Sequence, residues 1–206
     1  MHRELPSPER TGGRPLAECL GERRSVRDYA NAPISLAELS QLLWAMQGET
    51  GAGGQRASPS AGGLYPLRVH VRARRVSDLP SGIYAYDGAA HGLESLGDGI
   101  GQTPLADVGI GDQPWLEAAA AVVGIGAELE RVVSHFEAQN PRGARGMRYV
   151  FIETGAAAQN AHLQATALGL GFVLVAGFHD DEARAALRFG DDVAPTALLC
   201  IGRPHG

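Results

Sequence analysis

The feature that most constrains the fold is a stretch from residue 149 to residue 170 that is small or apolar on nearly every side of a helix. A helix without a solvated face has to be buried, either in the core of its own chain or against a partner. Glu153, Asn160 and Gln164 interrupt the pattern at i, i+7 and i+11, so they share one face and each needs a hydrogen-bond partner. The stretch therefore predicts a long central helix with one polar stripe.

Shorter patterns elsewhere predict both helices and strands. Ser35 and Glu38 form a capping box, and leucines at helical spacing then predict a helix that ends at Gly48. Strict alternation of apolar and polar residues over 67–74 predicts a strand with one solvent-exposed face. Further strands are expected over 83–86, 118–125, 172–178 and 196–201, short helices over 15–21 and 180–189, and an irregular stretch over 88–114. Because strands and helices mix without a regular βαβ rhythm, the expected fold class is α+β.

Length and composition fit one globular domain. The chain has 206 residues, and a single domain usually has about 150. Its content of 44% hydrophobic and 20% charged residues is typical of globular proteins. Residues 1–14 are polar with proline and glycine, so we expect a flexible N-terminal arm followed by a single domain over 15–206. No apolar run reaches the roughly 20 residues needed to span a membrane, and the N-terminus lacks the apolar stretch of a signal peptide. With two lone cysteines, Cys19 and Cys200, these features predict a cytoplasmic protein.

The charged residues exclude several functions. A net charge of −5 argues against nucleic-acid binding, which depends on a surplus of clustered cations. All 18 basic residues are arginine, so a lysine Schiff base, a lysine general base and a Walker-type phosphate lysine are ruled out.

Three common site motifs also fail. The run from Gly124 to Leu129 follows an apolar stretch but lacks the third glycine of a dinucleotide fingerprint. The seven histidines are scattered and form no HExxH or paired spacing, so no metal site is expected. Ser60 lacks the preceding glycine of a nucleophile elbow, because Ser58 occupies that position.

Two segments, taken together, are candidates for a ligand-binding site. Arg23, Arg24, Ser25 and Arg27 can give forked, charge-assisted hydrogen bonds to a phosphate, although alone they also fit a solvated charged run. The segment 59–66 combines small residues, which let backbone amides approach a planar ligand, with an aromatic ring; alone it also fits an ordinary turn.

These motifs resemble the nitroreductase superfamily, and specifically its SagB-type branch, whose best-known members oxidise azolines to azoles in modified peptides. The resemblance runs from about Glu22 to Pro204 and rests on six motifs in order: RRSVRDY, PSAGGLYPL, SGIYAYD, RYVFIETGAAAQN, ALGLGF and IGRP. It implies an α+β sandwich with a mixed or antiparallel central sheet flanked by helices. It also implies a homodimer formed through the long central helices, with FMN at the interface and contacted by both chains.

The resemblance assigns roles to particular residues. The ribityl phosphate and the pyrimidine edge of FMN would be held by Arg23, Arg24, Ser25 and Arg27, and Arg203 would close on the phosphate. The isoalloxazine ring would be lined by Ser60, Gly62, Gly63 and Leu64. Its reactive edge would lie near Ala176 and Gly177. Hydride transfer through flavin N5 is the implied chemistry, with the cofactor carrying the reaction and the protein supplying position and charge. The electron donor would be NAD(P)H or a small or peptide-derived substrate.

The sequence departs from azoline-oxidising relatives at one point. Those proteins use a Lys-Tyr pair shortly before the position of Arg148 and Tyr149, and this chain has no lysine. His135 in the same region can act as a base near neutral pH, or be a partly exposed bystander on its helix. His135, Tyr65 and Tyr149 are thus the candidate catalytic side chains.

Two other functions stay open beside an FMN enzyme. One is a flavin-binding partner or scaffold without turnover in a biosynthetic pathway, and the other is an α+β domain that binds no flavin.

Overall fold

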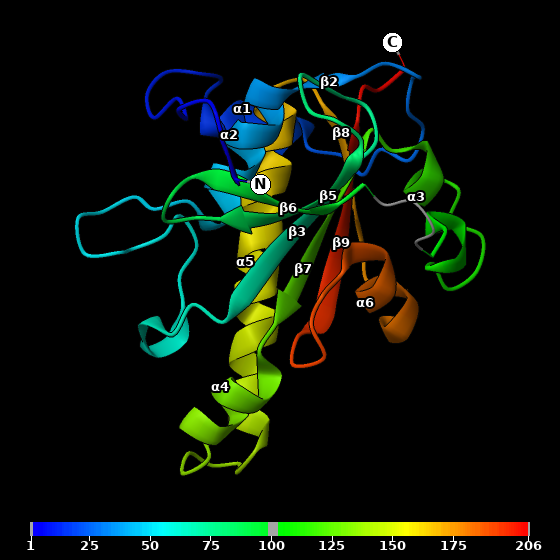
Figure 1. The fold of residues 1–206 in the computed structure, drawn as a ribbon. Helices are drawn as coiled ribbons and strands as arrows, with labels where there is room; N and C mark the ends of the chain where they lie inside the picture. The colour runs from blue at the N-terminus through cyan, green and yellow to red at the C-terminus, as the bar shows by residue number, and fades with distance from the viewer. Residues whose placement is uncertain (1, 99–102, 206) are drawn as a thin grey trace.

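The computed structural model describes residues 2–98 and 103–205, and these are built around a seven-stranded antiparallel sheet (Figure 1). The strand order is β1-β6-β5-β3-β7-β9-β8. The strands are β1 (His2–Glu4), β3 (Leu67–Ala73), β5 (Gly82–Asp87), β6 (Gly92–Gly97), β7 (Ala121–Ala127), β8 (Gly171–Val175) and β9 (Ala194–Gly202). A separate parallel pair joins β2 (Ile34–Ser35) and β4 (Val76–Ser77). The α+β class predicted from the sequence is confirmed.

Strand β7 lies between β3 and β9, and every one of its residues is buried. Its small side chains let helices approach closely. A Cβ atom on Gly124 would overlap the side chain of Leu187. Glycine at this position therefore permits helix α6 (Asp180–Leu187) to pack directly on the strand.

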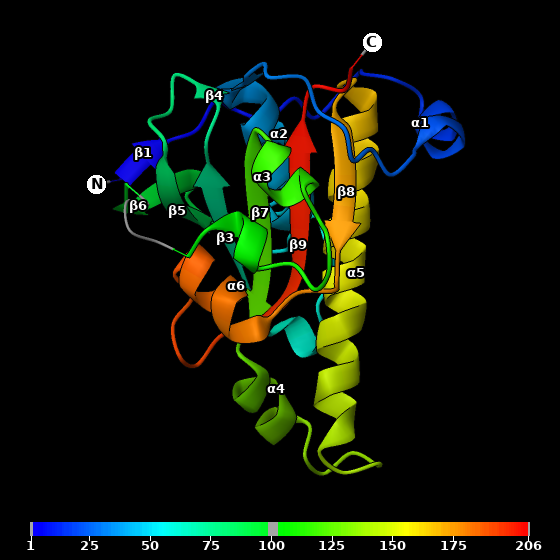
Figure 2. The same ribbon diagram turned by 90° about the vertical axis from the view of Figure 1, so that its right-hand side faces the viewer.

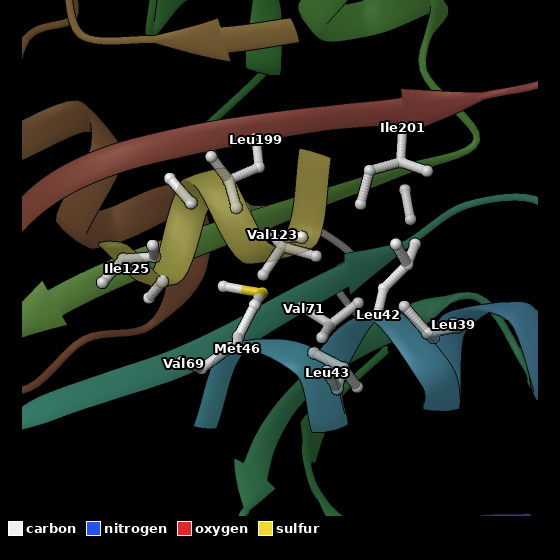
Figure 3. Packing of buried hydrophobic residues seen from close by; sticks show 14 of the residues in the cluster. Leu39, Leu42, Leu43, Met46, Val69, Val71, Val123, Ile125, Leu199 and Ile201 are labelled. Atoms are coloured by element: carbon white, nitrogen blue, oxygen red, sulfur yellow. The ribbon is translucent and has the colours of Figure 1, made fainter. Parts of the chain in front are cut away.

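Helices cover both faces of the sheet (Figure 2). On one face lie α2 (Leu36–Gln47) and α5 (Ala144–Ala167), and on the other lie α6 and the short α3 (Trp115–Ala118). In the core of the first face, α2 packs against β3, β7 and β9 (Figure 3). The side chains involved are Leu39, Leu42, Leu43, Met46, Val69, Val71, Val123, Ile125, Leu199 and Ile201.

The predicted helices are found with shifted ends. The capping box of α2 is formed, because the Glu38 amide donates to Ser35 Oγ over 3.1 Å and the Ser35 amide donates to Glu38 Oε2 over 2.7 Å. Helix α5 starts at Ala144, five residues before its predicted start. Helix α4 (Leu129–His135) packs on these added turns, and α1 (Leu16–Glu22) lies near the other end of α5.

Two segments of the chain differ from what the sequence predicted. The segment 1–14, expected to be a loose arm, contains β1, which pairs with β6, and Leu5 is buried. The stretch 88–114, expected to be irregular, contains β6 and a 3₁₀ turn at Leu105–Asp107; its residues 99–102 lie outside the described part of the chain. Among the described helices, none has both the length and the apolar character needed to cross a membrane.

Candidate functional site

The arginine segment, residues 23–27, lies along the edge of the sheet. The amide of Val26 donates to the carbonyl of Phe172 in β8 over 2.9 Å. Tyr29 packs so closely on Gly171 and Gly202 that a Cβ atom on either glycine would lie within 3.0 Å of its side chain. Since β8 is an outer strand, the segment is held in place while its own side chains remain accessible.

The guanidinium groups of this segment have no acidic partner among the described residues. Arg24 donates only to backbone carbonyls, those of Gly21 over 3.0 Å and Arg23 over 2.8 Å. Arg27 lies over the ring of Trp115, with its Cζ 5.4 Å from the ring centroid. Three neighbouring cations that lack carboxylates are suited to an anionic ligand, since charge-assisted hydrogen bonds from arginine are strong and directional.

Arg203 joins this segment through its backbone but not through its side chain. Its carbonyl accepts from the amide of Ala30 over 2.9 Å. Its guanidinium instead forms a 2.8 Å ion pair with Glu38 and donates to the carbonyl of Pro33. The chain segments of Arg27 and Arg203 are thus adjacent, whereas the two guanidinium groups point to different partners.

The glycine loop, residues 57–66, has an unusual backbone. Gly62, Gly63 and Tyr65 have φ values of 62°, 65° and 47°, in the left-handed region. Ser60 closes the loop, because its hydroxyl accepts from the amide of Tyr65 over 2.9 Å. A Cβ atom on Gly63 would meet nothing within 4 Å, so this side of the loop offers bare backbone to whatever approaches it.

The candidate catalytic side chains lie around the same loop. A Cβ atom on Gly62 would be 3.4 Å from Phe136 and 3.8 Å from Nε2 of His135. Phe136 in turn makes an edge contact with the ring of Tyr149, whose hydroxyl donates to Gln139 over 2.8 Å. The structure therefore places His135 near Gly62, and both His135 and Tyr149 against the ring of Phe136.

Tyr65 has its partners on Arg56, the residue just before the loop. Its hydroxyl accepts from the amide of Arg56 over 3.3 Å, and the Arg56 guanidinium lies 4.9 Å from the centre of its ring. These contacts indicate that Tyr65 shapes the loop.

The polar stripe of α5 holds the glycine loop. Asn160 donates to the carbonyl of Ala57 and to Ser58 Oγ, both over 3.1 Å. Glu153 Oε1 accepts from the amide of Ala61 over 2.7 Å. Gln164 accepts from Gln41 of α2 over 3.4 Å. The prediction that each residue of the stripe has a partner is confirmed.

A histidine that the sequence analysis did not single out holds the arginine segment. His162 Nε2 donates to the carbonyl of Arg24 over 3.0 Å, and its ring stacks on Phe172. Burial lowers the pKa of this imidazole, so the neutral form is favoured. Its only signal in the sequence was a polar residue among alanines on the predicted helix.

These anchors place the two segments on opposite sides of α5. Glu153 and His162 are nine residues apart, and at 3.6 residues per turn their side chains point in roughly opposite directions. Figure 1 shows the same arrangement, with the loop that carries Ala61–Gly63 on one side of α5 and β8 on the other. A single chain therefore keeps its glycine loop apart from its arginine segment.

The side of α5 away from Glu153 also bears an exposed apolar patch, formed by Met147, Phe151 and Ile152. Phe151 is 52% exposed and Ile152 is 61% exposed. Gly155 next to them would accept a Cβ without any contact. An exposed patch of this kind is typical of a surface that binds another protein.

Ala176 and Gly177 directly follow β8 and are exposed. The carbonyl of Gly177 accepts from Gln113 Nε2 over 2.6 Å and from the amide of Ile110 over 3.0 Å. They lie beyond the opposite end of β8 from Phe172, where the arginine segment is attached. Within the described residues, no cluster of three or more metal-binding side chains occurs.

Comparison with known proteins identifies the family. The Nitroreductase family model matches residues 20–203. A nitroreductase homologue of Methanocaldococcus jannaschii, MJ1384, is 38% identical over 188 residues, which make up 91% of this chain and 90% of the relative.

Solved structures agree with that match. A nitroreductase homologue from Ralstonia eutropha has a TM-score of 0.81 at 29% identity, and the match covers 100% of this chain and 90% of that one. A chain of the E. coli microcin synthetase McbBCD complex, solved with truncated pro-MccB17 bound, has the same fold, with a TM-score of 0.71 at 22% identity over 98% of this chain and 78% of that one. The chain therefore belongs to the nitroreductase family of oxidoreductases.

Proposed function

We propose that the protein is an FMN-dependent oxidoreductase whose two sites are each shared between the chains of a homodimer. The observation that carries this proposal is the set of three arginines, Arg23, Arg24 and Arg27, that lack carboxylate partners among the described residues. With the hydroxyl of Ser25, they match the donor chemistry that a ribityl phosphate needs.

The glycine loop fits the other end of such a cofactor. The bare backbone at Gly62 and Gly63, with Ser60 and Leu64 beside it, suits a flat ring that approaches closely. When bound, FMN would supply the hydride chemistry at its N5 atom. We assign Ala176 and Gly177 to the neighbourhood of its reactive edge, and Arg203 to the phosphate once its guanidinium leaves Glu38.

The dimer follows from the placement of the two segments. Because α5 separates them within one chain, a site that uses both needs the loop of a second copy. The apolar patch at Met147, Phe151 and Ile152 lies on the side of α5 where that copy would pack. Most homodimers are two-fold symmetric, so one interface would create two equivalent sites.

In this site the protein would position the cofactor and stabilise the charge that develops on it. Guanidinium groups of the arginine segment would stabilise negative charge on the bound cofactor. His135 Nε2, beside Gly62, is placed to hold or accept a proton from a substrate at the loop. NAD(P)H is the proposed electron donor, and a small or peptide-derived molecule is the proposed substrate.

The SagB-type branch remains part of this proposal. It is supported by the fold shared with a chain of the microcin synthetase complex and by the six motifs. Azoline oxidation in this chain would depend on a base other than lysine, and His135 is the residue available. Buried, unpaired Cys19 and Cys200 support a reducing compartment such as the cytoplasm.

The absence of lysine favours one alternative, a flavin-binding partner or scaffold without turnover. Purified protein should be yellow and should release FMN on denaturation. NADPH, NADH or a peptide substrate should then bleach the flavin anaerobically. A yellow protein that none of these reduces supports the scaffold, and a protein that releases no flavin refutes both proposals.

A mixing experiment tests whether the site is shared. Arg27→Ala removes a guanidinium from one segment, and Gly63→Val places a branched side chain on the open face of the other. Each variant alone should bind little FMN. Random dimers formed by unfolding and refolding the two together should recover about a quarter of the wild-type sites, because each heterodimer has one intact site. No recovery would show that both segments act within one chain.

A further inference from the structure

Glu153 is a buried carboxyl group in the middle of α5. Only 4% of its surface is exposed, and it forms no ion pair among the described residues. Burying an acid without a cation is unfavourable unless hydrogen bonds compensate. The buried position of this carboxyl group therefore needs a specific reason.

Its contacts are with the tightest part of the glycine loop. The amide of Ala61 donates to the carboxyl group over 2.7 Å. Burial raises the pKa of Glu153, and the hydrogen bond from Ala61 and the nearby Ser60 hydroxyl oppose the rise. Ser60 Oγ also accepts from the amide of Tyr65. Glu153 thus holds the start of the turn at Ala61, and Ser60 closes the turn onto Tyr65.

The turn needs such support because its backbone is uncommon. Gly62, Gly63 and Tyr65 all have positive φ values, and a non-glycine residue in this region is strained. Conformations of this kind persist only where the surrounding structure holds them. Asn160 holds the loop further upstream, at Ala57 and Ser58, so it cannot substitute for Glu153 at the turn itself.

We propose that Glu153 is the positioning residue of the flavin-binding turn: it holds the backbone of Ala61 so that the bare face of Gly62 and Gly63 is presented to the cofactor. The cofactor part of this inference rests on the proposed function. Glu153 acts through the loop and is not placed in contact with the flavin.

Three substitutions separate this role from general support of the fold. Glu153→Gln keeps an oxygen acceptor for the Ala61 amide, whereas Glu153→Leu keeps the size and removes the acceptor. Thr154→Val is the matched control, because the Thr154 hydroxyl is also buried on α5 but is bonded to Thr196 of β9 rather than to the loop.

The first readout is hydrogen exchange of the Ala61 amide, measured by NMR on protein freed of flavin. Glu153→Leu should accelerate this exchange about tenfold, the loss expected for one hydrogen bond to a buried acceptor. Glu153→Gln and Thr154→Val should leave it within about twofold of wild type. Unchanged exchange in Glu153→Leu would overturn the inference, whatever the protein binds.

The second readout is the dissociation constant for FMN, followed by quenching of flavin fluorescence. We expect about a tenfold rise in Glu153→Leu, rescue in Glu153→Gln and little change in Thr154→Val. Equal weakening in Glu153→Leu and Thr154→Val would show general destabilisation and overturn the inference. If wild-type protein binds no FMN while Ala61 exchange responds as expected, the proposed function fails and the support of the turn by Glu153 stands.

Discussion

Replacing the exposed apolar residues of α5 should separate the proposed dimer. Phe151 and Ile152 are each more than half exposed in the single chain, at 52% and 61%. Fully burying such a side chain is worth about 1.5–3 kcal/mol, so burying the exposed half contributes roughly 1 kcal/mol. Two-fold symmetry brings four such side chains into the interface, which gives about 4 kcal/mol, or a thousandfold in the dissociation constant.

The double variant Phe151→Ser/Ile152→Ser should therefore be monomeric at concentrations where the wild type is a dimer. Sedimentation velocity over a dilution series measures this shift. The free energy of unfolding of the separated chain should fall by no more than about 2 kcal/mol, because about half of each side chain is already exposed there. A variant that stays dimeric with unchanged affinity would refute the assignment of this patch. Flavin binding should be lost together with the dimer.

Three further outcomes are expected. Arg23→Ala should weaken FMN retention by about 1.5–3 kcal/mol through loss of a charged phosphate contact, whereas the exposed Arg142→Ala should not; equilibrium dialysis compares them. Gly124→Val should lower the free energy of unfolding by about 1–3 kcal/mol, because the added side chain collides with Leu187, and a denaturant titration measures the loss. Burial lowers the pKa of His162 below its ordinary 6.5, so its contribution to stability is fully present above pH 6.5 and is lost as the pH falls below 6.5 through the lowered pKa of the folded state. His162→Gln should accordingly flatten the decline in unfolding free energy between pH 7.5 and 5.5.

The elements with strong local patterns were predictable from the sequence. The apolar circumference of α5 and its polar stripe both follow from 3.6-residue periodicity, and the Ser35–Glu38 capping box depends on neighbours within one turn. The early start of α5 was not predictable. Gly146 lies so close to α4 that a Cβ there would be 2.7 Å from the carbonyl of Val132, and this packing is a tertiary effect.

The short strands depend on pairing rather than on pattern. Strand β6 includes Glu94 and Ser95 and lacks clean alternation, yet it forms because β5 and β1 flank it. The three residues of β1 carry no strand signal of their own. Their assignment requires knowing which strand lies next to them.

In the candidate site too, features set by local motifs were predictable, and contacts between distant residues were not. The motifs singled out the arginine segment and the glycine loop. The structure places His135 near Gly62 and Tyr149 against Phe136, and their catalytic role stays a prediction. The ion pair between Arg203 and Glu38 could not be foreseen, because it joins residues 165 positions apart. The anchoring of Arg24 by His162 was missed for the same reason.

The ends of the large sheet bear on how this molecule can associate with others. A bare outer strand can recruit a strand from another molecule and start aggregation. Here one outer strand is the very short, charged β1. The other outer strand, β8, is covered by the arginine segment, whose Val26 amide bonds to it. Continuous sheets running from molecule to molecule are therefore disfavoured.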